Sequence, residues 1–114
     1  MKKWTLGSFV FTALFSLISL SSFASDVTST FKVNGECGMC KKKIETALRV
    51  KGVSKVNWDK ETHDLTVSYN PDKITLDEIH HRIATVGYDT DTVKATDAAY
   101  SKLDQCCQYD RTKI

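Results

Sequence analysis

The sequence predicts an α+β fold whose strands and helices follow the order β-α-β-β-α-β, with a short extension at the C-terminal end. Two stretches repeat apolar residues at the 3.6-residue period of amphipathic helices, and four short stretches alternate or cluster apolar residues as strands do. The 114-residue chain is long enough for one small domain with a modest core. We expect two helices on one face of a four-stranded antiparallel sheet.

The first half of the domain is predicted from apolar spacing and turn residues. Phe31 and Val33 alternate with polar neighbours as in a strand, and Gly52 marks the end of the helix that follows. Alternation on both sides of a polar turn then indicates an antiparallel hairpin. The expected elements are a strand over residues 28–33, a loop over 34–38, a helix from residue 39 to about 51, and hairpin strands over 53–58 and 65–69.

The second half begins with a capping box, because Thr75 and Glu78 are spaced to satisfy each other's backbone N–H groups. An apolar stripe follows at helical spacing and ends before Gly87. The members of this stripe are Leu76, Ile79, Ile83 and Val86. A last strand is expected over residues 88–94, antiparallel to the first. The complete order is that of the ferredoxin-like, split βαβ arrangement.

The first 24 residues have the pattern of a secretory signal peptide. Lys2 and Lys3 precede an apolar stretch over residues 6–20, and the small residues Ser22 and Ala24 on either side of Phe23 provide a cleavage site. The apolar stretch is shorter than the roughly 20 residues that span a bilayer. We therefore expect residues 1–24 to be cleaved and the protein to be periplasmic or otherwise exported, with no stable membrane insertion. Residues 25–94 would form the domain and 95–114 the extension.

The charge of the chain argues against nucleic acid as a partner. The formal net charge is +2, and Lys2 and Lys3 within the expected signal peptide account for it. The remaining chain is formally neutral, whereas nucleic-acid-binding domains usually carry a basic surface.

Two cysteine pairs carry the chemistry of the chain. Cys37 and Cys40 are three positions apart where the first loop meets the first helix, and a helix N-terminus favours the thiolate form. Thiolates bind soft metals and also attack disulfides, so this spacing alone leaves both chemistries open. Cys106 and Cys107 are adjacent in the extension. They could add ligands to the first pair, bind a second ion, form disulfides with the first pair, or remain free on a loosely held tail.

Residues 28–94 resemble a heavy-metal-associated domain, a family that includes small copper chaperones, domains of heavy-metal P-type ATPases and the periplasmic mercury-binding protein. The matching features are residues 33–40, the helix with Ile44, Glu45, Ala47 and Leu48, the Gly52-Val53 step, the hairpin, and Gly87-Tyr88. The resemblance implies that Cys37 and Cys40 bind one soft ion, Cu(I) or Hg(II) first, with Zn(II) as a further candidate. It implies a monomeric binding protein, not an enzyme, that meets a metal-transporting membrane protein or another metal-binding domain transiently.

Three positions near the cysteines need a separate interpretation. The family usually has Met two residues before the first cysteine, whereas Gly35 stands here and Met39 lies between the two cysteines. We expect Met39 to fill the core gap beneath the loop, with a thioether ligand as the alternative. Tyr88 would shield the site from water or simply fill the core.

The remaining polar side chains are expected on the surface. The lysines at 41–43 are predicted to form a solvated helix face, with a docking patch for an acidic partner as the alternative. His63, His80 and His81 lack the spacing of a metal site and are predicted to be surface residues.

The sequence thus favours an exported soft-metal carrier or scavenger that works by thiolate ligand exchange. The first alternative is a periplasmic thiol–disulfide exchange protein with Cys37 as nucleophile and Cys40 as resolving thiol. A second alternative is an interaction module in which the thiols form a structural disulfide.

Overall fold

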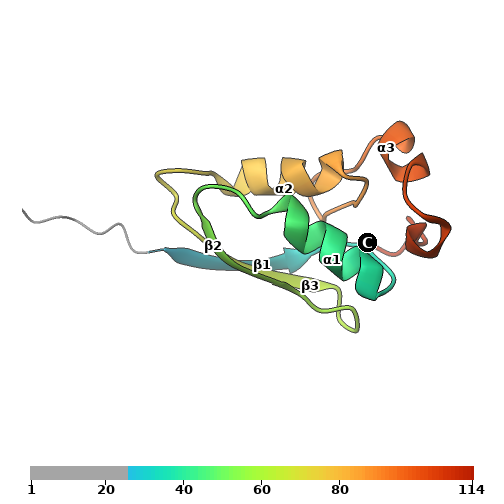
Figure 1. Ribbon diagram of the computed structural model, residues 1–114, viewed down its shortest axis with the longest axis horizontal. Coiled ribbons are helices and arrows are strands. Elements are labelled where there is room, and N and C mark those ends of the chain that lie inside the picture. Colours follow the sequence, from blue (N-terminus) through green and yellow to red (C-terminus); the bar gives the residue numbers. More distant parts are fainter. Residues whose placement is uncertain (1–25) are drawn as a thin grey trace, which may run out of the picture.

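The computed structural model describes residues 26–114, so the expected signal peptide lies outside the described residues. The helices α1 and α2 lie on the same face of the sheet, as the sequence predicts (Figure 1). The elements are β1 (Val27–Lys32), α1 (Gly38–Ala47), β2 (Val53–Trp58), β3 (Asp64–Tyr69), α2 (Leu76–Thr85), α3 (Asp97–Ser101) and a 3-10 turn, η1 (Gln105–Cys107). Among the described residues, every helix is too short or too polar to cross a bilayer.

The sheet has three antiparallel strands in the order β1-β3-β2, one fewer than expected. The predicted last strand over 88–94 is reduced to a single bridge between Val33 and Thr90. Its continuation is prevented by a turn at Thr90, whose hydroxyl accepts hydrogen bonds from the backbone N–H groups of Thr92 and Val93. The chain therefore leaves the sheet edge after Thr90, and the extension approaches α1 instead.

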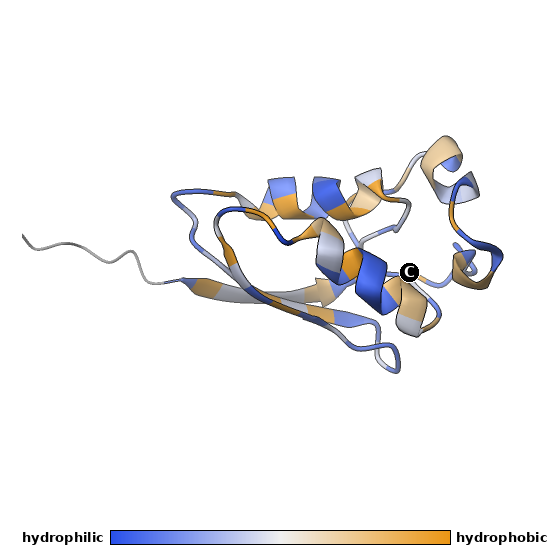
Figure 2. Cartoon of the chain, viewed as in Figure 1, coloured by the Kyte–Doolittle hydropathy of each residue, from blue (hydrophilic) through white to orange (hydrophobic). Residues whose placement is uncertain are grey.

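The core lies between the sheet and the two long helices. Figure 2 shows the apolar residues of α2 on the side that faces the sheet. The largest fully buried side chains of the core are those of Trp58, Tyr88, Ile44, Leu48, Leu65, Ile79, Ile83, Val33 and Val67. The capping box is present, since the Thr75 hydroxyl accepts from the Glu78 N–H and the Glu78 carboxylate accepts from the Thr75 N–H. Val86, predicted to continue the apolar stripe, is exposed because α2 ends at Thr85.

One histidine is buried, contrary to the prediction that all three lie on the surface. The His80 ring stacks on Phe31 with 3.9 Å between ring centroids, and its Nδ1 lies 2.7 Å from the Thr90 hydroxyl. The turn that replaces the fourth strand thus supplies a partner that makes burial tolerable, and burial lowers the pKa of His80. His81 is exposed as predicted, and His63 is half-buried against Trp58.

Candidate functional site

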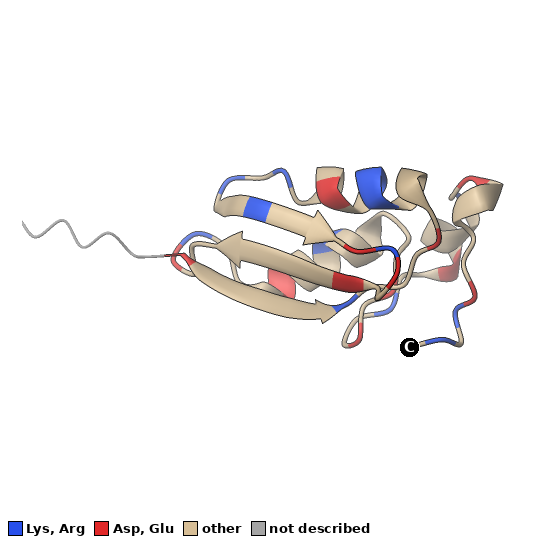
Figure 3. Cartoon of the chain, turned by 90° about the horizontal axis from the view of Figure 1, so that it is seen from below, with Lys and Arg blue, Asp and Glu red and all other residues tan. Residues whose placement is uncertain are grey.

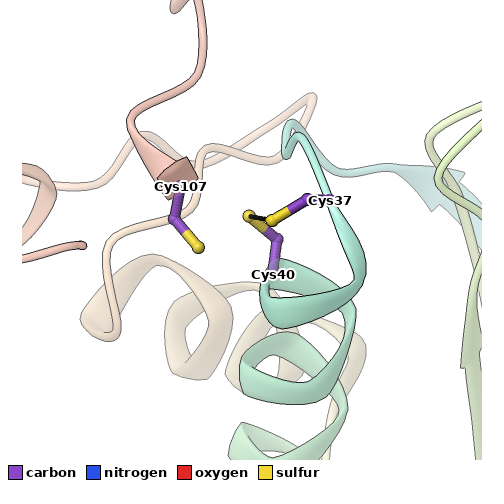
Figure 4. Close-up of side chains that lie close together, drawn as sticks. All are labelled: Cys37, Cys40 and Cys107. Carbon is purple, nitrogen blue, oxygen red and sulfur yellow. Dashed lines mark hydrogen bonds between the residues drawn. The ribbon is translucent and has the colours of Figure 1, made fainter. Parts of the chain in front are cut away.

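Cys37 and Cys40 converge where the loop after β1 enters α1. Cys37 is the N-cap residue of α1, and Cys40 lies in its first turn. Residues three apart on a helix lie on the same face, so both side chains point to the same side. Their sulfurs are 3.8 Å apart (Figure 4). The predicted convergence of the first thiol pair is therefore present in the structure.

The two thiols differ in their protonation. The backbone N–H of Cys40, followed by that of Met39, stabilises the Cys37 thiolate and lowers the pKa of Cys37 to about 7. Cys40 is buried, and burial raises the pKa of its thiol to about 11. One sulfur of the pair is thus partly accessible and readily ionised at neutral pH, whereas the other sits in the core and stays protonated there.

A third sulfur reaches this pair from the extension. Cys107 in η1 is buried, and its side chain points toward Cys37 and Cys40 (Figure 4). The three sulfurs all lie within 4.8 Å of one another. Burial raises the pKa of Cys107 as well. Of the arrangements left open for the second thiol pair, the structure favours approach of one member to the first pair.

The extension is firmly held by Arg111. Its guanidinium donates to both carboxylate oxygens of Asp89, at 2.8 and 3.0 Å, and to the backbone oxygen of Ala95 at 2.7 Å. The Asp89 side chain is only 1% exposed, and this pairing lowers the pKa of its carboxyl group against the opposing effect of burial. The alternative of a loosely held tail is therefore wrong.

Tyrosines complete the attachment of the extension. The Tyr109 hydroxyl donates to the Gly87 oxygen at 2.8 Å and accepts from the Asp89 N–H at 2.9 Å. The Tyr100 hydroxyl donates to the Tyr109 oxygen at 2.6 Å. None of these contacts has a recognisable spacing in the sequence. The signal that could have indicated them is the occurrence of two tyrosines and an arginine in a polar tail, since aromatic residues usually pack against a surface.

Comparison with known proteins identifies the family. The family model described as the heavy-metal-associated domain matches residues 30–89, more than half of the chain. The chain belongs to the heavy-metal-associated domain family.

Relatives within the heavy-metal-associated domain family include transporters and chaperones. A zinc-transporting ATPase of Synechocystis is 41% identical over 63 residues, which cover 54% of this chain and 9% of the ATPase. The copper chaperone CopZ of Staphylococcus saprophyticus is 36% identical over 64 residues, covering 54% of this chain and 94% of the chaperone. A solved CopZ metallochaperone superposes with a TM-score of 0.54 at 29% identity, over 56% of this chain and 98% of that one. This chain therefore matches a small part of the ATPase and nearly all of the chaperone.

Gly35 replaces the methionine that the heavy-metal-associated domain family usually has beneath the metal loop. A Cβ at Gly35 would lie 2.8 Å from the Trp58 ring, so the indole fills this space. The Trp58 ring is fully buried, and its Nε1 donates to the Val33 oxygen at 2.9 Å. In this chain a tryptophan from β2 therefore supports the loop from below, and the absent methionine leaves no gap.

Met39 does not fill the core as predicted. Its side chain is 47% exposed, because it faces outward from the first turn of α1, and the space below the loop is taken by Trp58. The Met39 sulfur lies 3.8 Å from the sulfur of Cys106, which is also exposed. The five sulfur residues considered from the sequence therefore divide into a buried or half-buried group of three and an exposed group of two.

Tyr88 borders the three-sulfur group from the core. It is fully buried, and among the described residues its hydroxyl has no hydrogen-bond partner. Burial raises the pKa of this hydroxyl, and the neighbouring thiols of Cys107 and Cys40 raise it further. The protonated Tyr88 hydroxyl can therefore donate a hydrogen bond to a neighbouring cysteine thiolate.

The lysines at the start of α1 are not a uniform solvated face. The Lys41 ammonium donates to the carboxylate of Glu45, the side-chain oxygen of Asn57 and the backbone oxygen of Trp58, at 2.7 to 2.9 Å. Lys43 reaches Asp104 in the extension at 3.2 Å. Acidic and basic residues are also interspersed along the described chain (Figure 3). Two of the three lysines thus have intramolecular roles.

Proposed function

We propose that this protein is an exported carrier or scavenger of soft metal ions, which Cys37 and Cys40 bind as thiolates. The observation that carries the proposal is the 3.8 Å approach of these two sulfurs at the start of α1. It occurs within a heavy-metal-associated domain whose match, residues 30–89, contains both cysteines. A readily ionised Cys37 can take an ion first, and Cys40 then closes around it.

Cu(I) is the ion that we propose first, with Hg(II) second and Zn(II) third. Soft thiolate donors favour soft ions, and zinc in proteins almost always takes four ligands. The copper chaperone that this chain matches over nearly the whole chaperone length supports Cu(I). The match to a zinc-transporting ATPase, which covers only 9% of that protein, is the reason that Zn(II) is retained.

Transfer by ligand exchange explains how such a site would work without being an enzyme. A thiolate of the partner replaces one cysteine at a time, so no acid–base pair or substrate pocket is required. The partner that we propose is a metal-transporting membrane protein or a second heavy-metal-associated domain, contacted briefly by the monomer. The exposed side of Cys37 offers the place of entry.

The test is a titration of the reduced protein with Cu(I), Hg(II) and Zn(II) against a competing chelator. Wild-type protein is expected to hold Cu(I) and Hg(II) more tightly than Zn(II), and Cys37→Ser is expected to lose this tight binding. Thr46→Ala, an exposed substitution on the same helix, is the matched control and should bind as the wild type does. If the protein binds no soft ion but catalyses disulfide exchange, the carrier function is wrong and the protein is a thiol–disulfide exchange protein.

Export is tested separately from metal binding. Expression in a Gram-negative host should yield periplasmic protein whose measured mass corresponds to a chain that begins at Ser25. Leu14→Arg places a charge within the apolar stretch and should block both export and processing. Processed Leu14→Arg protein, or unprocessed wild-type protein in the cytoplasm, would contradict the export proposal.

A further inference from the structure

We infer that Cys107 is a third metal ligand, so that the C-terminal extension closes a three-thiolate site over the ion. This inference rests on the proposed soft-metal function and deepens it, because it changes the coordination number, the preferred ion and the ease of release. It assigns a role to residues beyond the heavy-metal-associated domain match, which ends at residue 89.

The separation of the sulfurs suits three ligands better than two. At a metal–thiolate distance of about 2.3 Å, two sulfurs on opposite sides of an ion would be about 4.6 Å apart. Three sulfurs in a plane around the ion would be separated by about 4.0 Å at the same bond length. Cys37 and Cys40 are 3.8 Å apart, and Cys107 lies within 4.8 Å of both. These separations are compatible with three sulfurs around one ion.

The 3-10 turn η1 separates its two cysteines by direction. Three residues make one turn of a 3-10 helix, so neighbours point about 120° apart. Cys107 is fully buried at the pair, whereas Cys106 is exposed and lies beside Met39. Of the two adjacent thiols, Cys107 is therefore the one that belongs to the three-sulfur group and that the backbone directs inward (Figure 4).

Contacts that involve no sulfur hold Cys107 in this place. The Arg111 guanidinium donates to the Asp89 carboxylate, and the Tyr109 hydroxyl bonds to the backbone of Gly87 and Asp89. The Asn34 side-chain amide donates to the Asp110 backbone oxygen at 3.2 Å. These bonds join the extension to the loop before the first thiol pair and to the segment that follows α2. The third sulfur is thus positioned before an ion arrives, which reduces the entropy that binding must overcome.

The number and kind of these ligands bear on the preferred cargo. The only group of metal-ligand side chains found in the described part of the chain consists of Cys37, Cys40 and Cys107. A trigonal sulfur site suits Cu(I) and Hg(II), whereas Zn(II) would have to recruit a fourth ligand. Because ligand exchange replaces one cysteine at a time, release from three thiolates takes one more exchange step than release from two. Retention is therefore favoured over rapid delivery.

The deciding experiment counts sulfur ligands in the Cu(I)-loaded, reduced full chain by X-ray absorption at the copper edge. Wild type and Cys106→Ser, the adjacent control, should each show three sulfurs, and Cys107→Ser should show two. In a chelator competition, Cys107→Ser should lose roughly tenfold or more in Cu(I) affinity, because even loss of an outer-shell partner typically costs about that much. Cys106→Ser should keep the wild-type affinity.

Two outcomes overturn different statements. Tight Cu(I) binding by wild type with only two sulfurs, or equal affinities of wild type and Cys107→Ser, would overturn the three-thiolate inference and leave the carrier intact. Absence of tight binding by the wild type would overturn both. The wild-type sulfur count needs no substitution, so it decides the inference even if Cys107→Ser does not fold.

Discussion

The two cysteine pairs of this chain are organised in opposite ways. Cys37 and Cys40, three positions apart at the start of α1, bring their sulfurs to 3.8 Å. Cys106 and Cys107, adjacent in η1, diverge so that one is exposed and the other is buried beside the first pair. Helical spacing lets two thiols act together, whereas adjacency separates them and lets only one join a distant site.

The pairs also differ in what positions them. The first depends on a short local run of strand, loop and helix, together with the support of Trp58 below. The second depends on side chains that contact segments far away in the sequence, above all Arg111 and Tyr109. Substitutions that weaken one support should therefore affect one cysteine pair more than the other. The expected effects of these substitutions differ in size.

The largest effect is expected from Arg111→Gln, which removes the partner of a buried carboxylate. Leaving Asp89 without its cation should cost about 3 kcal/mol in the free energy of unfolding, measured by denaturant titration. Asp97→Asn is the control, since Arg111 contacts Asp97 only at a fully exposed carboxylate, and its effect should stay below about 0.5 kcal/mol. Equal effects of both substitutions would show that the extension is not held by the buried pair.

The next effect concerns Gly35, in the loop before α1, and Gly38, the first residue of α1, whose substitution by alanine should change stability differently. A Cβ at Gly35 would meet the Trp58 ring at 2.8 Å, so Gly35→Ala should destabilise by about 2 kcal/mol. A Cβ at Gly38 meets nothing within 4 Å, and Gly38→Ala should be neutral or stabilise by up to about 1 kcal/mol, because alanine is the better helix residue. Thermal unfolding of both variants makes the comparison, and a harmless Gly35→Ala would contradict the close packing of Trp58.

A pH dependence of about tenfold is expected for the reactivity of Cys37. With a pKa of about 7, its thiolate fraction rises roughly tenfold between pH 6 and pH 8, and alkylation should rise in proportion. Cys40, with a pKa of about 11, stays protonated throughout this range and should react slowly. Mass spectrometry of reduced protein after brief alkylation measures both rates. A Cys37 rate that keeps rising about tenfold per pH unit through pH 8 and levels off only near pH 9 would show that the helix amides do not stabilise its thiolate.

The smallest effect is expected for the contact that links α1 to the extension at the surface. The Lys43–Asp104 pair is exposed, so Lys43→Ala should change the free energy of unfolding by less than about 1 kcal/mol, and added salt should remove the difference. Lys41→Ala should be more costly and less sensitive to salt, since the Lys41 ammonium donates to the Asn57 side-chain oxygen and the Trp58 backbone oxygen as well as to Glu45. Equal salt sensitivity would mean that both lysines act only through charge.

Local patterns account for the parts of the structure that the sequence predicts. The alternation in the hairpin, the Thr75–Glu78 capping box and the convergence of Cys37 and Cys40 each depend on residues within a few positions of one another. The order of elements follows from these patterns, which is why the ferredoxin-like arrangement could be predicted.

The missed features depend on partners that are distant in sequence. His80 is buried because its ring stacks on Phe31 and its Nδ1 hydrogen-bonds to Thr90. No sequence spacing indicates that either residue contacts His80. The fourth strand ends at once because the Thr90 side chain competes for backbone N–H groups. Whether Cys107 reaches the first pair is decided by that same turn and by the anchoring of Arg111, so no pattern within the extension could predict it.

The span between the two cysteine pairs has a consequence during protein synthesis. Cys37 and Cys106 are separated by 69 positions, and the Asn34–Asp110 bond spans 76. At about 5 to 20 residues per second, the second pair is made roughly 3 to 14 seconds after the first. During that interval the growing chain contains Cys37 and Cys40 but not Cys107, so it passes through a stage with the first thiol pair alone. The three-sulfur cluster exists only after residues 105–111 have been translated and have docked.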